Sequence, residues 1–426
     1  MIRIILLLLL FLTICTPSAS EDLSIKGQIA PQVMVNKDGD YIRLPHRLLN
    51  LELELSRDEI SMNSVFDLEY SSKDNSVSPG LRESFIDYAH SFGDLYLGKQ
   101  IITWGSADAN NPTDNINPYD YYYLMNEGAD RRIGNLMARE EIYIKDFTFT
   151  LVLTPFFTPA RLPDEDDFPI FRRPQSISMQ TSTQGTVDVP LGDETSTPRA
   201  ELHNSEGGIR GRLALSQIEI AASYFEGFDR QPSPVFGFPP VQTPYFDYWT
   251  YYRTKVIGLE LIGLYSNFAL RTEGAYFLTE DTEGEEPFIR NPYFQYVAQL
   301  DWNGPEQTMV ILQYMGMRST KIDDDAEEEA EDNLPVGMGT IFCSLARSGI
   351  MGIVKKDIGD APHRLEMRAL YDMDKKGYMI GGSFSFSSVD AFYVKLGVNY
   401  FDGDEESAFN TMNGFSHVLL QGKYSF

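Results

Sequence analysis

The sequence has few cysteines, few basic residues and, after its N-terminus, no long hydrophobic run. Of its two cysteines, Cys15 lies in the N-terminal hydrophobic stretch, so only Cys343 remains for the rest of the chain. A single cysteine allows neither an intramolecular disulfide nor a cysteine zinc site. A transmembrane helix needs about 18 consecutive apolar residues, and none follows the N-terminus, which excludes a helical membrane domain.

The deficit of basic residues excludes another class of protein. The chain has 35 Lys and Arg against 62 Asp and Glu, a formal net charge of −27. Nothing in this balance neutralises phosphates, so we expect no nucleic-acid partner. The excess of acid suits a surface that meets cations.

Catalytic and cofactor motifs are also missing. The five histidines show no metal-ligand spacing such as H-E-x-x-H. There is no G-x-S-x-G, no P-loop and no Rossmann glycine pattern. We therefore predict a protein that is not an enzyme, with no catalytic residue, no metal and no cofactor, apart from the calcium alternative considered below.

The N-terminus has the pattern of a secretory signal peptide. Arg3 precedes a short apolar core, and small residues stand at Ser18 and Ser20. We predict a signal peptide over residues 1–20 and one barrel domain over residues 21–426. Removing residues 1–20 takes away one charge, that of Arg3, so the net charge becomes −28. A lipoprotein site at Cys15 is the alternative, but Ile14 stands where a small residue is needed.

Segments in which apolar and polar residues alternate recur along the whole chain. In 49–56, four leucines alternate with polar residues, and 392–400 repeats the pattern. A period of two separates the two classes on the faces of a strand and would scatter them around a helix. The predicted strands are 24–34, 47–57, 60–70, 81–90, 94–103, 135–145, 147–156, 207–215, 217–226, 252–264, 266–278, 291–302, 307–317, 336–357, 363–372, 377–387, 390–401 and 414–426. The segment 336–357 is read as one long strand or two short ones.

The connections between these strands alternate between short turns and long segments. Long extracellular loops and short periplasmic turns are typical of outer-membrane barrels. The pattern predicts an all-β fold, a transmembrane antiparallel up-and-down β-barrel of about 18 strands (16–18), in the bacterial outer membrane. The predicted long segments are 35–46, 71–80, 104–134, 157–206, 227–251, 279–290 and 319–335.

The polar faces of the predicted strands carry charges, among them Glu52, Glu273 and Arg271. A basic residue that faces lipid at the membrane centre costs about 2–4 kcal/mol, so these faces should line the interior. A soluble β-sandwich with its polar faces outward is the alternative. The charged faces together with loops that are long on one side only favour the barrel, which at this size leaves a wet lumen unless something plugs it.

The last segment, 418–426, has the form of a strand that closes such a barrel. Val418, Leu420, Tyr424 and Phe426 share one face, which we expect to meet lipid, and Gln421 and Lys423 share the other. The ending resembles the terminal strand of outer-membrane proteins. That resemblance implies that Tyr424 and Phe426 form the signal read by the barrel-assembly machinery.

The densest local pattern is Gly98-Lys-Gln, followed by Trp104-Gly105 and the Asn111-Pro-Thr-Asp114 loop. Here the chain resembles a family of largely uncharacterised, porin-like outer-membrane β-barrel proteins. The match includes the segment 81–88 and the terminal hairpins. The resemblance implies an outer-membrane channel or transport role, and it supplies no substrate and no catalytic residue.

The segment 104–131 is rich in Asp, Asn and Pro and predicts either of two structures. It folds into the lumen and constricts it, or it stays an extracellular loop satisfied by its own turns. Its oxygens are also possible Ca²⁺ ligands over 108–120, although the spacing is not that of an EF-hand. The candidate lumen residues are Asp108, Asn110, Asn111, Asp114, Asn115 and Asp120, together with Arg210, Arg212, Arg271 and Arg368 from the strands.

Two further segments carry alternatives. The acidic run 323–332 is a solvated loop tip, or it collects cations and bridges to lipopolysaccharide through divalent ions. The aromatic segment 225–252 is an interfacial girdle, or it captures an apolar or sugar ligand. The candidate capture residues are Phe236, Phe238, Tyr245 and Trp249.

These patterns together predict a porin-like channel for passive or substrate-preferring passage of small solutes, favouring cations. The expected partners are outer-membrane lipid and lipopolysaccharide, the barrel-assembly machinery and small solutes. The alternatives are a barrel that binds or exports an apolar or sugar ligand, and a plugged structural or adhesin barrel. The sequence does not indicate an oligomeric state.

Overall fold

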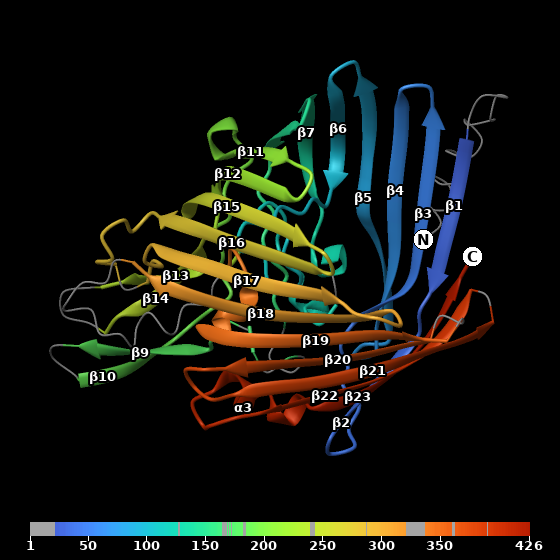
Figure 1. The fold of residues 1–426 in the computed structure, drawn as a ribbon. Helices are drawn as coiled ribbons and strands as arrows, with labels where there is room; N and C mark the ends of the chain where they lie inside the picture. Colours follow the sequence, from blue (N-terminus) through green and yellow to red (C-terminus); the bar gives the residue numbers. More distant parts are fainter. Residues whose placement is uncertain are drawn as a thin grey trace.

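The chain folds into a closed antiparallel β-barrel with 18 strand positions in its wall (Figure 1). The computed structural model describes residues 22–126, 128–163, 168, 170–171, 173–181, 185–238, 243–286, 288–320, 337–359, 363–389 and 391–426. The signal-peptide prediction for residues 1–20 and the acidic run 323–332 lie outside the described residues. Neighbours in sequence pair in space, so the predicted up-and-down topology is confirmed.

The wall strands follow the predicted segments closely. They are β1 (Asp22–Ile29), β2 (Gln32–Asn36), β3 (His46–Arg57), β4 (Ile60–Ser71), β5 (Ser76–His90), β6 (Gly93–Gln100), β7 (Asn135–Ile144), β8 (Phe147–Thr154), β11 (Glu206–Ala214), β12 (Ile218–Phe228), β15 (Arg253–Tyr265), β16 (Phe268–Thr279), β17 (Tyr293–Asn303), β18 (Thr308–Ser319), β19 (Ser348–Ile358), β20 (His363–Asp372), β21 (Tyr378–Val389), β22 (Phe392–Asp402) and β23 (His417–Ser425).

The remaining elements lie in the connections. Two hairpins extend beyond the long-loop ends of the wall strands (Figure 1). They are β9 (Ser176–Thr181) with β10 (Gly185–Pro190), and β13 (Ser233–Gly237) with β14 (Tyr245–Thr250). The helical turns are η1 (Tyr121–Tyr123), η2 (Gly128–Arg131), η3 (Leu202–Asn204), η4 (Ile341–Ser344), α3 (Ala408–Thr411) and η5 (Asn413–Phe415). No helix among the described residues is long and apolar enough to span a membrane.

Two predicted strands differ from those observed. The segment 24–34 is one wall position split into β1 and β2 around Pro31, because proline has no N–H to give to a ladder. The segment 336–357 is a strand only in its second half, β19. Its first half contains η4 and enters the lumen, so the prediction of a long strand there is wrong.

The barrel closes where β23 meets β1 and β2. β2 pairs with residues 417–421 of β23, and Gln28 and Ile29 of β1 pair with Ser425 and Tyr424. The last residue continues the ladder, since the N–H of Phe426 donates to the Gly27 carbonyl at 2.9 Å and the Gly27 N–H donates back at 2.8 Å. The predicted closing strand is confirmed. Recognition of Tyr424 and Phe426 by the assembly machinery remains a prediction.

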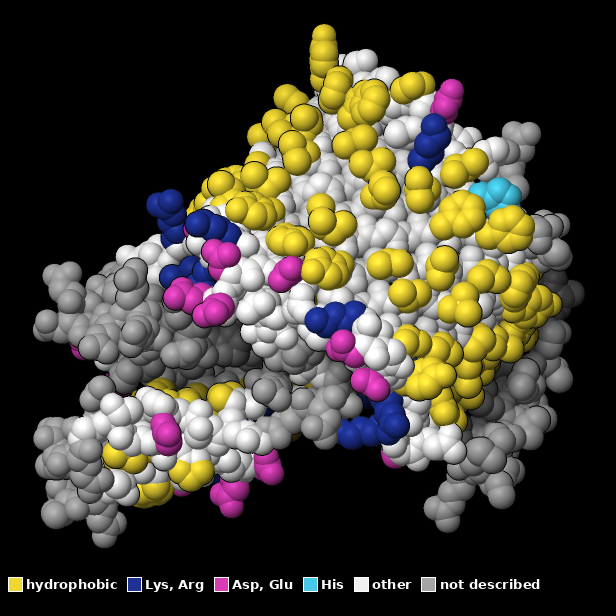
Figure 2. Space-filling view, turned by 90° about the horizontal axis from the view of Figure 1, so that it is seen from below, with side chains coloured by type: hydrophobic (Ala, Val, Ile, Leu, Met, Phe, Trp, Pro, Cys, Tyr) yellow, Lys and Arg dark blue, Asp and Glu magenta, His cyan; other side chains and the backbone are white. Residues whose placement is uncertain are grey.

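The outer face of the wall is apolar. On β23, Val418, Leu420 and Tyr424 are exposed, whereas Gln421 and Lys423 line the interior, as the alternation predicts. Figure 2 shows hydrophobic side chains spread over the wall, with few charged groups between them. A surface of this kind is stable against lipid rather than water.

The facing of the strands gives a first quantitative prediction. Leu259 is 62% exposed and points outward from the middle of β15, whereas Tyr265 ends the same strand beside a short turn. We expect Leu259→Arg to lower the free energy of unfolding in lipid by about 2–4 kcal/mol, and Tyr265→Arg by about 0–1 kcal/mol. Reversible denaturant titration in vesicles measures both variants. Equal effects would contradict the assigned depth.

Part of the hydrophobic core lies inside the barrel. Trp104 and Ile116 from the β6–β7 connection pack with inward-facing Phe225, Val256 and Phe277 from the wall. The β6–β7 connection therefore fills this side of the lumen and is held there by burial of apolar surface as well as by hydrogen bonds.

Candidate functional site

The β6–β7 connection, residues 101–134, crosses the lumen. Gln100 and Asn135 are paired across β6 and β7, so the connection leaves and rejoins the wall at one point. Its first part, residues 104–117, contacts β16–β18, and its second part, residues 119–131, contacts β3–β5. The connection therefore divides the interior, which is the lumenal alternative of the sequence analysis.

The first contact with the wall is made through the carboxylate of Glu273 on β16. Its Oε1 accepts hydrogen bonds from the backbone N–H groups of Ser106 at 2.5 Å and Ala107 at 2.6 Å, and its Oε2 accepts one from Thr113 Oγ1 at 2.9 Å. Gly105 has a φ of +95°, and a Cβ there would lie 2.7 Å from the same carboxylate. Glycine at this position permits the close approach.

Amide side chains from β17 and β18 continue this contact. Gln299 Oε1 accepts from the Asp108 N–H at 2.8 Å, and Gln299 Nε2 donates to Asp108 Oδ2 at 2.8 Å. Asn110 Nδ2 donates to Gln313 Oε1 at 2.5 Å, and Asn110 Oδ1 accepts from Thr340 Oγ1. Gln299, Gln313, Asn110 and Thr340 are fully buried, so these bonds are shielded from water.

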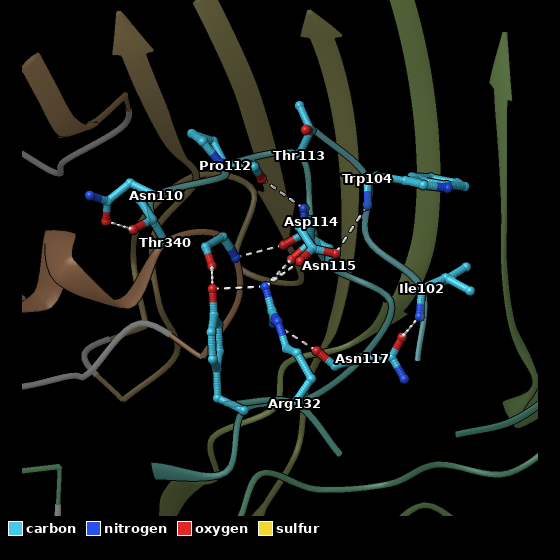
Figure 3. A network of polar contacts seen from close by, with 12 residues as sticks. Ile102, Trp104, Asn110, Pro112, Thr113, Asp114, Asn115, Asn117, Arg132 and Thr340 are labelled. Carbon is cyan, nitrogen blue, oxygen red and sulfur yellow. Dashed lines mark hydrogen bonds and ion pairs between the residues drawn. The ribbon is translucent and has the colours of Figure 1, made fainter. Parts of the chain in front are cut away.

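The centre of the connection is a buried ion pair (Figure 3). Arg132 Nη2 donates to Asp114 Oδ2 at 2.6 Å, and Nη1 donates to the Asn117 carbonyl at 2.8 Å. Asn115 Oδ1 accepts from the Gly339 N–H at 2.6 Å, which joins this network to the β18–β19 connection. The asparagines thus hold loop backbone, because their short amide side chains satisfy buried N–H and C=O groups.

Burial acts on the acidic residues of the network. It raises the pKa of Asp114 above its ordinary value, and the neighbouring guanidinium of Arg132 acts in the opposite direction. Burial likewise raises the pKa of Asp120, against the effect of Arg161. Both carboxylates depend on an arginine partner for their charge.

The second part of the connection is held to the opposite wall by ion pairs between side chains. Glu69 on β4 binds Arg161 through two bonds of 2.8 Å and accepts from the Tyr123 hydroxyl at 2.7 Å. Arg161 also approaches Asp120, with 3.4 Å between Nη1 and Oδ2. The side chain of Arg161 is 41% exposed, so this contact is wet, unlike the contact at β16–β18.

A second buried ion pair joins the loops to each other. Arg230 and Glu206 are almost fully buried, with 2.9 Å between Arg230 Nη1 and Glu206 Oε1. Arg230 Nη2 donates to the Ile116 carbonyl at 2.9 Å. Arg230 therefore links the start of β11, the β12–β13 connection and the lumenal loop.

A cavity of about 1130 Å³ remains beside the loop. It lies between residues 121–126 of the loop and the wall formed by β1–β3 and β20–β23. Its lining runs from the short-turn end, at Gly359 and Ala391, to the long-loop end, at Leu44 and Phe168. The charged residues that line it are Arg47, Arg82, Arg364, Arg368, Lys395 and Lys423, against Asp130, Asp357 and Glu366.

The structure separates the predicted lumen residues into two groups. Arg368 lines the cavity. The side chains of the loop residues other than Asn111 bind loop or wall groups. Arg210 pairs with Glu260 at 2.7 Å, and Arg271 pairs with Asp301 at 2.9 Å. Those outside the cavity lining are Asp108, Asn110, Asn111, Asp114, Asn115, Asp120, Arg210, Arg212 and Arg271. Among the described residues, no group of three or more His, Cys, Asp or Glu is placed to hold a metal. Binding of Ca²⁺ by oxygens of 108–120 stays a prediction.

The predicted aromatic capture residues lie in β13, β14 and the segment between them. Trp249 is buried and donates from Nε1 to the Gly192 carbonyl at 2.7 Å, and Phe236 packs on Phe288 with 4.5 Å between the ring centroids. Phe238 and Tyr245 remain exposed. The hairpin forms a two-stranded sheet of its own, separate from the barrel sheet. The girdle and the capture site both stay predictions.

Sequence reasoning missed several cavity residues, and one of them shows why. Strict alternation along β5 would place Arg82 and its neighbour Glu83 on opposite faces. A β-bulge interrupts this alternation: Val65 of β4 pairs with Glu83 and Phe66 pairs with Leu81, so Arg82 is the extra residue of β5. The Arg82 side chain contacts Asp130 in the lumen. Two adjacent charged residues in a membrane strand were the available signal, because lipid accepts neither.

The fold is that of outer-membrane porin barrels of known structure. Solved structures with a similar fold include those of three Occ/Opd proteins. OpdK of Pseudomonas aeruginosa, solved with vanillate, has a TM-score of 0.54 at 8% identity, over 95% of this chain and 98% of OpdK. OpdQ of the same organism has 0.53 at 8%, over 95% and 97%. OccAB3 of Acinetobacter baumannii has 0.51 at 9%, over 96% and 100%.

These likenesses concern the fold. The sequence matches no family model and no curated protein. The resemblance to porin-like barrels is therefore confirmed as an architecture, and the chemistry of this chain rests on its own residues.

Proposed function

We propose that this chain is a non-enzymatic channel of the bacterial outer membrane, through which small solutes diffuse along the cavity beside the lumenal loop. The observation that supports this most is a wet space of about 1130 Å³ inside a closed barrel with an apolar outer face. Lipid is then the surrounding partner of the wall. Bridging to lipopolysaccharide through 323–332 remains a prediction.

The charge of the preferred solute depends on the residues that line the cavity rather than on the net charge of the whole chain. The net charge of −27 favours cations at the surface. Among the described residues, however, six basic side chains and three acidic ones line the cavity. Local charges act more strongly than distant ones, which salt screens beyond about 10 Å. We therefore propose that the conduit prefers anions, while the cation preference remains the prediction of the overall charge.

Aromatic side chains sit among these charges. Tyr393 of β22 and Tyr122 of the loop line the cavity, and the Lys423 ammonium lies 5.4 Å from the Tyr393 ring centroid. The fold relative OpdK was solved with vanillate, an aromatic carboxylate. Both points support a small aromatic anion as the preferred class of solute.

The proposal predicts a reversal of selectivity. In planar bilayers with a KCl gradient, the wild-type chain should give a reversal potential of anion sign. Lys395→Glu with Lys423→Glu turns the cavity lining from net basic to net acidic and should change that sign. The control, Lys145→Glu, alters a turn residue outside the cavity lining and should leave the sign unchanged.

Two other results would overturn parts of the proposal. A silent bilayer would contradict the channel and favour the plugged structural barrel. A cation-signed wild-type potential that the double variant leaves unchanged would contradict the anion conduit. Uptake of an apolar or sugar ligand that disappears on removal of Phe238 and Tyr245 would favour the capture alternative.

A further inference from the structure

The lumenal loop is held by two kinds of contact with different responses to solutes. On the β16–β18 side, buried amides and the carboxylate of Glu273 hold it in a water-free contact. On the β3–β5 side it is held by ion pairs that border the cavity. Ions in solution compete for exposed ion pairs and barely reach buried hydrogen bonds. A charged solute can therefore act on one side of the loop only.

One of these wet contacts is made by Asp130 in η2. Arg82 Nη2 on β5 lies 2.7 Å from Asp130 Oδ1, and Arg47 Nη1 on β3 lies 3.7 Å from it. Arg47 Nη1 also donates to the Asp130 backbone carbonyl at 2.8 Å. The Asp130 side chain is 53% exposed, and all three residues line the cavity. The carboxylate of Asp130, a loop residue, is thus bound by two arginines of the wall beside the cavity.

Asp130 uses only part of what these arginines offer. Arg47 also pairs with Asp67 of β4, with 3.0 Å between Nε and Oδ2. Among the described residues, Arg82 Nε has no hydrogen-bond partner. A guanidinium binds a free carboxylate most strongly through two parallel N–H···O bonds, and Asp130 makes one with Arg82. A carboxylate that used both Nε and Nη2 would make one bond more than Asp130 does.

The turn that carries Asp130 is built to move without dragging the rest of the loop. Tyr119 and Arg132 form a β-bridge, and the Asp120 N–H donates to the Arg131 carbonyl at 2.9 Å, which closes the base of the turn. Arg132 is fixed there by Asp114. At the other end of η2, Gly128 has a φ of +56°, a conformation that glycine enters and leaves easily.

We propose that Asp130 is a built-in ligand of an anion site on Arg47 and Arg82, and that an entering carboxylate replaces it and releases η2 from the wall. The loop tip then moves out of the cavity, so the solute widens its own path. This inference rests on the proposed channel function and goes beyond it by naming a site and a gate. No bond is made or broken covalently, and the charge on the arginines stays compensated throughout.

Single-channel recording of the whole barrel tests this with benzoate as the anionic probe and benzyl alcohol as its neutral analogue. For the wild type we expect benzoate to raise the time spent in a larger conductance state several-fold, and benzyl alcohol to have no such effect. Asp130→Asn should occupy the larger state without benzoate and should no longer respond to it. Glu306→Gln, which breaks an exposed ion pair with Lys356 away from the loop, should respond as the wild type does.

A second variant locks the turn. Arg82→Cys with Asp130→Cys places two thiols at the latch in a chain whose remaining barrel cysteine, Cys343, is buried. A short bifunctional methanethiosulfonate, which spans the length of the missing arginine side chain, joins the two thiols. The cross-linked form should stay in the smaller state with or without benzoate, and reduction should release the larger state. A wild-type response to benzoate in Asp130→Asn, or an equal response to benzyl alcohol, would overturn the latch while leaving the channel intact. Absence of any conductance in the wild type would overturn the channel itself.

Discussion

Replacing residues 121–130 by a two-residue Asn-Gly turn is expected to raise the single-channel conductance several-fold. This segment supplies 121–126 and Asp130 to the cavity lining, so its removal widens the path at the loop. The ends are already adjacent, because the Asp120 N–H donates to the Arg131 carbonyl at 2.9 Å. The buried network around Arg132 lies below this point and is kept.

The matched control removes a hairpin that does not border the cavity. The Leu191 N–H donates to the Gln175 carbonyl at 2.8 Å, so the hairpin of β9 and β10 can be replaced by the same turn. Its described residues are not among those that line the cavity, and we expect unchanged conductance. If the loop variant folds, judged by its resistance to protease, and conducts like the wild type, then residues 121–130 do not limit the path.

Loss of the buried partner of Arg132 should have the largest effect on the loop's stability. Asp114→Ala leaves the Arg132 guanidinium, whose side chain is 3% exposed, without its carboxylate. Removing one partner of a buried ion pair costs about 3–5 kcal/mol, because an uncompensated charge remains in a low-dielectric site. Hydrogen exchange of the amides in 101–134, which reports the free energy of local opening, measures this directly.

Two comparisons separate this effect from a general loss of charge. Asp357→Ala removes the carboxylate partner of Arg364, whose side chain is 55% exposed, and should cost about 0–1 kcal/mol. Asp114→Asn keeps an acceptor for the Trp104 N–H and should cost less than the alanine variant. Loop exchange in Asp114→Ala that matches the wild type would show that Arg132 finds other compensation.

The wall could be predicted from the sequence because its pattern is local. A period of two assigns each residue of a strand to one face, and the alternating lengths of the connections assign the ends. The assignment of side chains to a face failed at Arg82, because the extra residue of a β-bulge inverts the alternation that follows it. The sequence of one strand does not show its register with the neighbouring strand. Pro31 indicated a break in the strand, but the prediction treated 24–34 as continuous.

The interior could be predicted only in outline. The composition of 104–131 indicated turns and a possible lumenal loop, but it did not indicate which residues anchor the loop and which face the cavity. Asp108 is held by Gln299, and Asn110 by Thr340, partners 191 and 230 residues away along the chain. The Asp and Asn residues of 108–120, which the sequence singled out, hold the loop in place. The cavity is lined instead by Tyr122, Asn126 and Asp130, which the sequence did not single out.

The sequence by itself therefore determined the barrel, a wall of about 18 strands and the chemical character of most strand faces. These follow from short-range alternation and from what lipid accepts. Only the tertiary structure decided where the open space lies and which charges border it. Both depend on contacts between the loop and strands that are far away in the sequence. They also depend on burial of acidic residues such as Asp114, which is used in an ion pair inside the protein. An acidic chain can for this reason enclose a basic conduit.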